Sequence, residues 1–221
     1  MRRQQWVAWA AVSALTMLLI VATTLYPYFP GDVAATLFIQ SLAAPGASWA
    51  EAITKTAQPP LGYVLVGITA VASWFIGGGR GALLSLISFA GMWLAGYWLN
   101  PWIARPRPSS SLVYVSRPLS GYSFPSIFAL TYASTIGYLA VLALKTRRGR
   151  VRLAVVSACC LLLLIGGSAR VILGAHWPSD VLISYLIGFC WGALLVSFLP
   201  PHGPAVTMPD ESSPAHQAGR E

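Results

Sequence analysis

Hydrophobic residues are gathered along this chain into six long runs separated by short polar segments. Each run has about 20 residues, the length that an α-helix needs to cross the hydrocarbon core of a bilayer. A segment inside lipid must satisfy its own backbone hydrogen bonds, so these runs predict helices. The predicted spans are residues 6–28, 59–77, 82–100, 125–144, 152–170 and 178–199. The pattern therefore predicts an all-α integral membrane protein, a six-transmembrane-helix bundle.

The polar segments predict how the spans are joined. Residues 30–58 are less hydrophobic than a span but keep apolar side chains at helical spacing, which predicts short interfacial helices on the outer face. Residues 101–124 are rich in proline and serine and predict an outer loop. The end of the chain, 200–221, is rich in proline, serine and glycine and predicts a disordered cytoplasmic tail. Residues 1–199 are then a single membrane domain.

Composition agrees with a lipid-solvated protein. Apolar residues make up 56% of the chain and charged residues 9%, whereas a soluble domain carries about 25% charged residues. The net charge of +8 could suggest a nucleic-acid partner. However, the most basic stretch, Lys145–Arg152, lies between two predicted spans, where anionic lipid headgroups are its expected contact. We therefore expect no nucleic-acid partner.

Basic residues also predict the orientation, because short cytoplasmic loops are enriched in lysine and arginine. If the six spans alternate, one side of the membrane receives Arg2, Arg3, Arg80, Lys145, Arg147, Arg148, Arg150 and Arg152. This predicts a multi-pass protein of a bacterial-type inner (cytoplasmic) membrane, with both termini cytoplasmic. The opposite side receives Lys55, Arg105, Arg107, Arg117 and Arg170. These outer cations oppose the trend, which indicates that a site requires most of them.

Three motifs within residues 100–180 carry the candidate chemistry. They read Asn100-Pro-Trp-Ile-Ala-Arg-Pro-Arg107-Pro, then Ser123-Phe-Pro-Ser126-Ile127-Phe128, and then Ser168-Ala-Arg170 followed by His176 and Asp180. All three flank spans at the same predicted face, so we expect them to converge in one outer pocket. Guanidinium groups and the unpaired amides of a helix that opens at Ser126 are suited to bind phosphate.

The histidine and aspartate of the third motif form a candidate catalytic pair. Proline favours the first position of a helix, so Pro178 predicts the start of the last span. Asp180 then lies in the first turn, close to the imidazole of His176. A carboxylate there can fix the tautomer and strengthen the imidazole as a nucleophile.

Together these motifs resemble those of the type-2 phosphatidic acid phosphatase, or haloperoxidase-like, superfamily of membrane lipid phosphatases. That family has Lys-x6-Arg-Pro, Pro-Ser-Gly-His and Ser-Arg-x5-His-x3-Asp. The resemblance implies that His176 attacks phosphorus to form a phosphohistidine and that Asp180 orients it. It implies phosphate binding by Arg107, Ser126, Arg170 and, in the family lysine's place, Asn100. It implies no metal or cofactor, and a membrane lipid with a phosphate or diphosphate headgroup as partner. Six spans argue against the soluble vanadium haloperoxidases of the same superfamily.

Ala169 stands where the family has the serine before the arginine, with Ser168 displaced by one, and this departure is small. Three other positions depart further. Asn100 replaces the lysine and offers a neutral donor in place of a full charge. Ile127 replaces the glycine and obstructs close approach of the backbone to a phosphate. Phe128 replaces the histidine that protonates the leaving oxygen, and general acid catalysis is typically worth about 10²–10⁴-fold. The side chains of Ile127 and Phe128 also predict an apolar mouth for the site.

These departures leave three hypotheses for function. The first is a catalytically impaired homologue that binds a lipid phosphate or diphosphate at an extracytoplasmic site. The second is an active phosphatase acting on a polyprenyl diphosphate or phospholipid through His176, since a diphosphate has the better leaving group. The third is a structural membrane protein with a vestigial site. A protein partner cannot be named from the sequence.

Overall fold

The structure is a computed structural model, and it describes residues 3–43 and 47–200. Every regular element in these residues is a helix. They are α1 (Arg3–Leu25), α2 (Asp32–Ser41), α3 (Ser48–Lys55), α4 (Leu61–Ile103), α5 (Ile127–Tyr132), the π-helix η1 (Ala133–Gly137), α6 (Tyr138–Thr146), α7 (Gly149–Ile172) and α8 (Pro178–Ser197). The tail predicted to be disordered, apart from Pro200, lies outside the described residues.

Five helical segments in the described part of the chain are long and apolar enough to cross a membrane: α1, α4, the continuous stretch from α5 through η1 to α6, α7 and α8. The all-α membrane class is thus confirmed. Two of the predicted spans, 59–77 and 82–100, fall within the 43 residues of α4.

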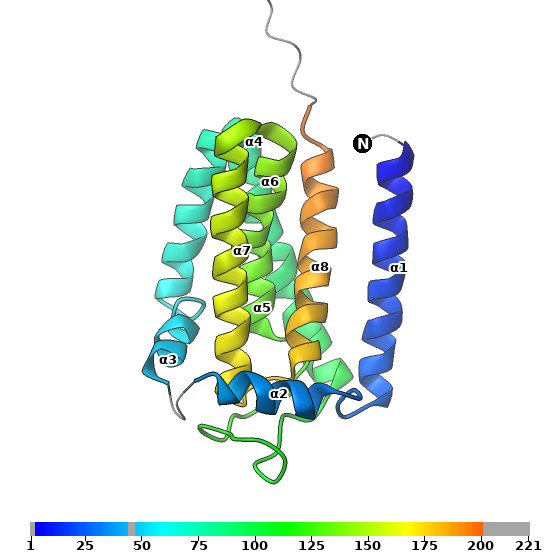
Figure 1. Cartoon of the computed structure of the whole chain (residues 1–221). Coiled ribbons are helices and arrows are strands. Elements are labelled where there is room, and N and C mark those ends of the chain that lie inside the picture. The colour runs from blue at the N-terminus through cyan, green and yellow to red at the C-terminus, as the bar shows by residue number, and fades with distance from the viewer. Residues whose placement is uncertain (1–2, 44–46, 201–221) are drawn as a thin grey trace, which may run out of the picture.

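The long helix α4 is interrupted at Gly78, whose φ of 69° and ψ of −169° are not helical. The chain folds back there. The two sides of the turn come so close that a Cβ on Gly81 would lie 2.8 Å from the carbonyl oxygen of Ser73. In Figure 1 the cyan first half of α4 rises from α3 to the far end of the bundle, and its second half returns. Glycine tolerates this backbone conformation because it has no Cβ.

The stretch α5–η1–α6 forms the centre of the bundle, and most of its side chains are buried. It packs against α4, α7 and α8, while α1 lies against α8 at the edge (Figure 1). Trp9 fastens α1 to α8 by donating to the carbonyl of Cys190 over 2.8 Å. The outer helices expose large apolar side chains, as expected of surfaces that face lipid.

Two basic residues at the far end of the bundle bind the ends of other helices. Lys145 donates to the carbonyls of Val196 (2.5 Å) and Leu199 (2.8 Å) where α8 ends, and Arg147 donates to the carbonyl of Phe75. A cation that binds the last carbonyls of a helix satisfies acceptors that lack partners within it. Part of the predicted lipid-facing basic stretch therefore serves internal contacts.

The opposite end of the bundle carries the two short helices and the longest loop. In Figure 1, α2 lies across this end beside the green loop that follows α4. Gln40 joins them, because its amide donates to the carbonyl of Tyr114 at 2.8 Å and to that of Ile172 at 3.2 Å. The three sequence motifs meet at this end.

Candidate functional site

A buried ionic cluster forms the base of the motif region. Arg105, which is 1% exposed, donates to the carboxylates of Asp180 and of Asp32, the latter over 3.4 Å. Ser123 also donates to Asp180, and the backbone N–H of Trp177 does so at 3.0 Å. The cluster therefore joins the loop after α4, the start of α2 and the first turn of α8.

His176 is held by the same segment of the loop. Its Nδ1 lies 2.7 Å from the carbonyl oxygen of Ser123, and the side chain is 4% exposed. A carbonyl only accepts, so Nδ1 carries the proton and Nε2 keeps its lone pair. Asp180 was expected in this orienting position. The structure instead gives that position to the Ser123 carbonyl, while the Ser123 hydroxyl binds Asp180, so the carboxylate reaches His176 through Ser123.

The surroundings of His176 favour its neutral form. Burial lowers the pKa of His176 well below its ordinary 6.5, the charges of Arg170 and Arg107 lower it further, and the bond to the Ser123 carbonyl partly opposes them. The imidazole is therefore neutral near pH 7, with a lone pair on Nε2.

A cavity of about 210 Å³ brings most of the predicted site residues together. Among its lining residues are Asn100, Arg107, Ile127, Phe128, Arg170 and His176. Thr54 and Gln58, which the motifs do not include, line it as well. The two arginines supply positive charge to the cavity, and His176 supplies a candidate nucleophile.

Arg107 is oriented by three carbonyl groups. It donates to those of Ala175 at 2.8 Å, Ser120 at 3.2 Å and Gly121 at 3.3 Å. A guanidinium has five N–H groups, so two remain for a ligand. Arg170 donates from Nη1 to the hydroxyl of Thr54 at 3.0 Å, and its buried Nε has no partner within the described structure.

The turn between α7 and α8 depends on Gly174, whose φ is 63°. A Cβ at this position would clash with the carbonyl oxygen of Tyr114. The backbone N–H of the next residue, Ala175, bonds the carbonyl of Arg170 at 3.0 Å and closes the end of α7. This close packing sets the spacing between Arg170 and His176.

The other predicted phosphate-binding residues have structural partners. Ser126 is fully buried: its hydroxyl accepts from the N–H of Ala129 at 3.3 Å, and its own N–H donates to Ser184 at 3.0 Å. It caps α5 and is not part of the cavity wall described above. Asn100 lines the cavity, but its amide donates to carbonyls of the loop, including Tyr122 at 3.1 Å. The groups of Ser126 at the start of α5 and the amide of Asn100 therefore already have hydrogen-bond partners within the protein.

The two apolar replacements lie at the cavity in different ways. Phe128 is 7% exposed, packs on Tyr132 with 4.2 Å between ring centroids, and has the guanidinium carbon of Arg170 at 5.6 Å over its ring. Ile127 is 42% exposed and also lines a hollow of about 260 Å³ with Trp93 and Tyr97. Ile127 is therefore the exposed apolar side chain at the mouth, whereas Phe128 is buried in the cavity wall.

Sequence reasoning missed several residues that build this site. Arg105 was counted among the outer cations, but not as the partner of two carboxylates. Ser123 begins the second motif segment but was given no role, and Thr54 lies outside the motifs, because hydroxyl side chains are common in loops and short helices. The excess of outer cations was the one available signal for Arg117, which lines neighbouring cavities.

Comparison with known proteins supports the resemblance that the motifs indicate. The sequence matches the PAP2 superfamily over residues 81–203, more than half of the chain. The fold is similar to the crystal structure of a transmembrane PAP2 type phosphatidylglycerolphosphate phosphatase from Bacillus subtilis. That likeness has a TM-score of 0.67 and 21% sequence identity, and covers 86% of this chain and 94% of the other. No curated protein gives a significant match. The motifs, the fold and the family match together identify the chain as a member of the PAP2 superfamily.

Proposed function

We propose that this protein binds the phosphate or diphosphate headgroup of a membrane lipid at an extracytoplasmic site, and that it hydrolyses this headgroup slowly or not at all. The observation that carries the proposal is a single cavity containing Arg107, Arg170 and His176 in which Phe128 occupies the place of the acid. The arginines can bind the phosphate and His176 can attack it, but no group at the place of Phe128 can protonate the leaving oxygen.

Binding is supported by the donors that the two arginines leave open. Arg107 has two N–H groups beyond its three carbonyl partners, and Arg170 has a buried Nε without a described partner. Burying an unsatisfied polar group costs about 1–3 kcal/mol, which a phosphate oxygen would remove. The charge-assisted bonds formed in this way are the strong class of hydrogen bond.

A lipid tail is the partner that the apolar mouth fits. Ile127 lines both the phosphate cavity and the hollow that Trp93 and Tyr97 line on α4, so the two lie side by side. These aromatic side chains are themselves exposed, as side chains at the headgroup level of a bilayer are. A lipid headgroup could therefore enter the cavity while its chain stays in the membrane.

Slow hydrolysis follows from the groups opposite His176. Neutral Nε2 can attack phosphorus, but an alkoxide leaves poorly without a proton. Phe128 carries no proton, and the amide of Asn100 is committed to loop carbonyls such as that of Tyr122. A general acid worth about 10²–10⁴-fold in rate contributes roughly 3–5 kcal/mol of transition-state stabilisation. Loss of the positive charge at position 100 removes further stabilisation.

The proposed topology has six crossings. A straight helix of 43 residues would be about 64 Å long, twice the hydrocarbon thickness, and α4 folds back at Gly78. Counting its halves separately places the start of α1 and the end of α8 on the same side, consistent with Figure 1. The excess of basic residues makes that side cytoplasmic in a bacterial-type inner membrane. The short helices α2 and α3 then lie at the outer interface.

An active phosphatase of restricted scope is the second candidate. It is favoured by one observation, the neutral imidazole of His176 with its lone pair available. A diphosphate needs a general acid least, so a polyprenyl diphosphate would be its substrate.

Phosphate release by purified protein tests the proposal. Lipid mono- and diphosphates are supplied in detergent micelles, with His176→Ala as the matched control, and lipid binding is measured on the same samples. We expect lipid-phosphate binding with little release. Rapid release from a lipid monophosphate that His176→Ala abolishes would establish the enzyme instead, and no binding at all would leave the vestigial-site hypothesis.

A further inference from the structure

We propose that the site has a second anion-binding subsite across Arg170 from His176, so that its ligand carries two phosphoryl groups. This inference rests on the proposed function and deepens it by naming the charge of the headgroup. It depends on a second cavity, on the balance of charge there and on the buried donor of Arg170.

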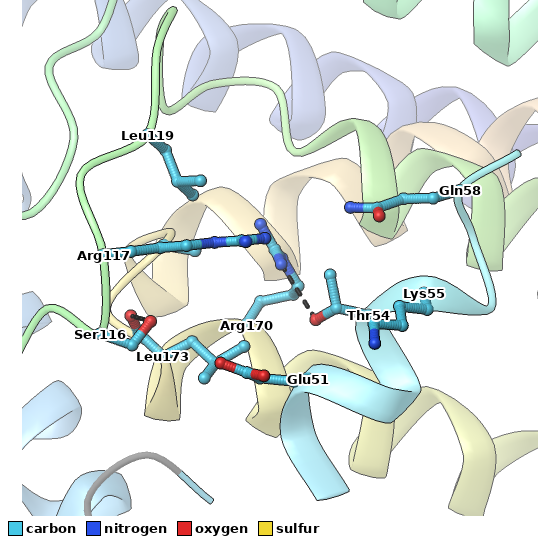
Figure 2. Close-up of a pocket in the computed structure, with 10 residues that line it drawn as sticks. Glu51, Thr54, Lys55, Gln58, Ser116, Arg117, Leu119, Arg170 and Leu173 are labelled. Atoms are coloured by element: carbon cyan, nitrogen blue, oxygen red, sulfur yellow. Dashed lines mark hydrogen bonds between the residues drawn. The ribbon is translucent and has the colours of Figure 1, made fainter. Parts of the chain in front are cut away.

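The second cavity lies between α3, the end of α7 and the loop that follows α4 (Figure 2). Its volume is about 150 Å³. It shares Thr54, Gln58 and Arg170 with the His176 cavity. The two cavities therefore adjoin, and Arg170 forms part of the wall between them.

Positive charge exceeds negative charge in this second cavity. Lys55, Arg117 and Arg170 line it, against the single carboxylate of Glu51. Within the described residues every salt bridge involves Arg105, so none of these three cations is paired with a carboxylate. In Figure 2 Arg117 extends across the cavity toward Arg170. An anion between two such cations replaces their repulsion with attraction.

Arg170 is the element that links the two subsites. It is 8% exposed, yet its Nε has no hydrogen-bond partner in the part of the chain that the structure describes. The Nη1 of the same guanidinium is fastened to Thr54 at 3.0 Å, so the group is held in place. A planar guanidinium binds oxygens in pairs along its edges. One guanidinium can therefore contact two neighbouring phosphoryl groups.

One neutral polar group of the second cavity suits the same ligand, because Gln58 presents an amide that can donate to a phosphoryl oxygen (Figure 2). The hydroxyl of Ser116 donates to the carbonyl of Leu173 at 3.1 Å and is not available to an anion. A monophosphate in the His176 cavity would leave Lys55 and Arg117 with only the carboxylate of Glu51 as counter-charge. A diphosphate satisfies both subsites, because its phosphoryl groups share one bridging oxygen.

Equilibrium binding to the full-length protein in detergent tests the inference with probes that cannot be hydrolysed. Farnesyl phosphonate offers one phosphoryl group, farnesyl methylenediphosphonate offers two, and methylenediphosphonate offers two without a lipid chain. We expect the wild type to bind the farnesyl diphosphonate at least about tenfold more tightly than the phosphonate, as an added set of charge-assisted bonds would give.

The double variant Lys55→Gln/Arg117→Gln should lose this preference and keep its affinity for farnesyl phosphonate. Both side chains are exposed, so folding should be preserved, and size-exclusion chromatography checks it. Arg150→Gln/Arg152→Gln is the matched control, since it removes the same charge from the other end of the bundle and should retain the preference.

The outcomes separate the inference from the proposed function. An unchanged preference in Lys55→Gln/Arg117→Gln, or none in the wild type, overturns the second subsite. Arg107→Gln should weaken both farnesyl ligands, and unchanged phosphonate binding there would overturn the proposed function. Lipid-free methylenediphosphonate that binds as tightly as its farnesyl form would support the subsite and assign it to a soluble diphosphate.

Discussion

The imidazole of His176 and the ring of Phe128 line the same cavity and offer it different chemistry. The imidazole is buried, bonded through Nδ1 to Ser123, and has an available lone pair. The ring packs on Tyr132 and beside the guanidinium of Arg170. At the scale of single residues, the proposed nucleophile is present, whereas apolar packing fills the place proposed for the acid.

Restoring the family residues should restore turnover. The triple variant Asn100→Lys/Ile127→Gly/Phe128→His should raise phosphate release from a lipid diphosphate by about 10²–10⁴-fold, the usual worth of a general acid. Each single change should do less, because residues of one catalytic unit are not additive. Adding His176→Ala to the triple variant should abolish the gain. No gain from the triple variant would mean that the cavity serves another purpose.

Acid should destabilise the protein through His176. The folded state keeps the pKa of His176 well below 6.5, so below that pH the unfolded chain binds a proton that the folded chain does not. Stability therefore falls as pH decreases from about 6.5 toward the lowered value. Thermal unfolding in detergent and phosphate-free buffer, followed from pH 7.5 to pH 5, measures this. His176→Asn should flatten the profile in that window, and an equally steep profile would contradict the assignment.

At the scale of elements, two turns bring the motifs together. The fold-back of α4 at Gly78 returns the chain to the end of the bundle where Asn100 and the following loop lie. The turn at Gly174 sets Arg170 and His176 around the end of α7. The loop between α4 and α5 is then tied to α8 and α2 by Arg105. Site geometry therefore depends on helix ends as much as on the side chains of the motifs.

Gly174→Ala should destabilise the protein and weaken phosphate binding, because the new Cβ meets the Tyr114 carbonyl in addition to straining a positive φ. Gly149→Ala is the matched control: its φ is 59°, and nothing lies within 4 Å of the added Cβ. Strain of a left-handed residue alone is of order 1–2 kcal/mol. We expect a clearly larger drop in thermal stability for Gly174→Ala, and equal drops would contradict the packing argument.

At the scale of the whole molecule, the charged residues are divided between the two ends of a lipid-solvated bundle. One end holds the glycine turn of α4 and the basic segment before α7. The other holds the buried Arg105 cluster and the arginines of the two cavities. This division is the basis of the proposed orientation, in which the end with more cations in short loops faces the cytoplasm.

Cysteine labelling in intact cells tests this topology. In a variant whose three native cysteines are replaced, single cysteines at Ser110 and Arg148, both exposed, report on the two ends. A membrane-impermeant maleimide should label Ser110→Cys in intact cells and Arg148→Cys only after permeabilisation. Labelling of both under the same condition would rule out the proposed orientation.

Local sequence was sufficient for the membrane class, the family and several of the residues that line the main cavity. Apolar runs of spanning length leave few alternatives in lipid, and motif spacing places Arg107, Arg170 and His176 near helix ends. Local sequence was also sufficient to expect short helices between the first two spans, and Gly-rich turns between others. Each of these features depends on residues that are close together along the chain.

Tertiary structure alone decided which groups contact one another. The His176 side chain is oriented by the carbonyl of Ser123, 53 residues away, and Asp180 accepts a hydrogen bond from Arg105, 75 residues away. Tertiary structure also joined Arg170 to Thr54 across 116 residues and so created the wall between two cavities. Hydrogen bonds and charge pairs depend on distance and direction, which helix packing sets between distant segments. A periodic pattern of apolar residues specifies which face of a helix is buried, but not the partner that each polar group will meet.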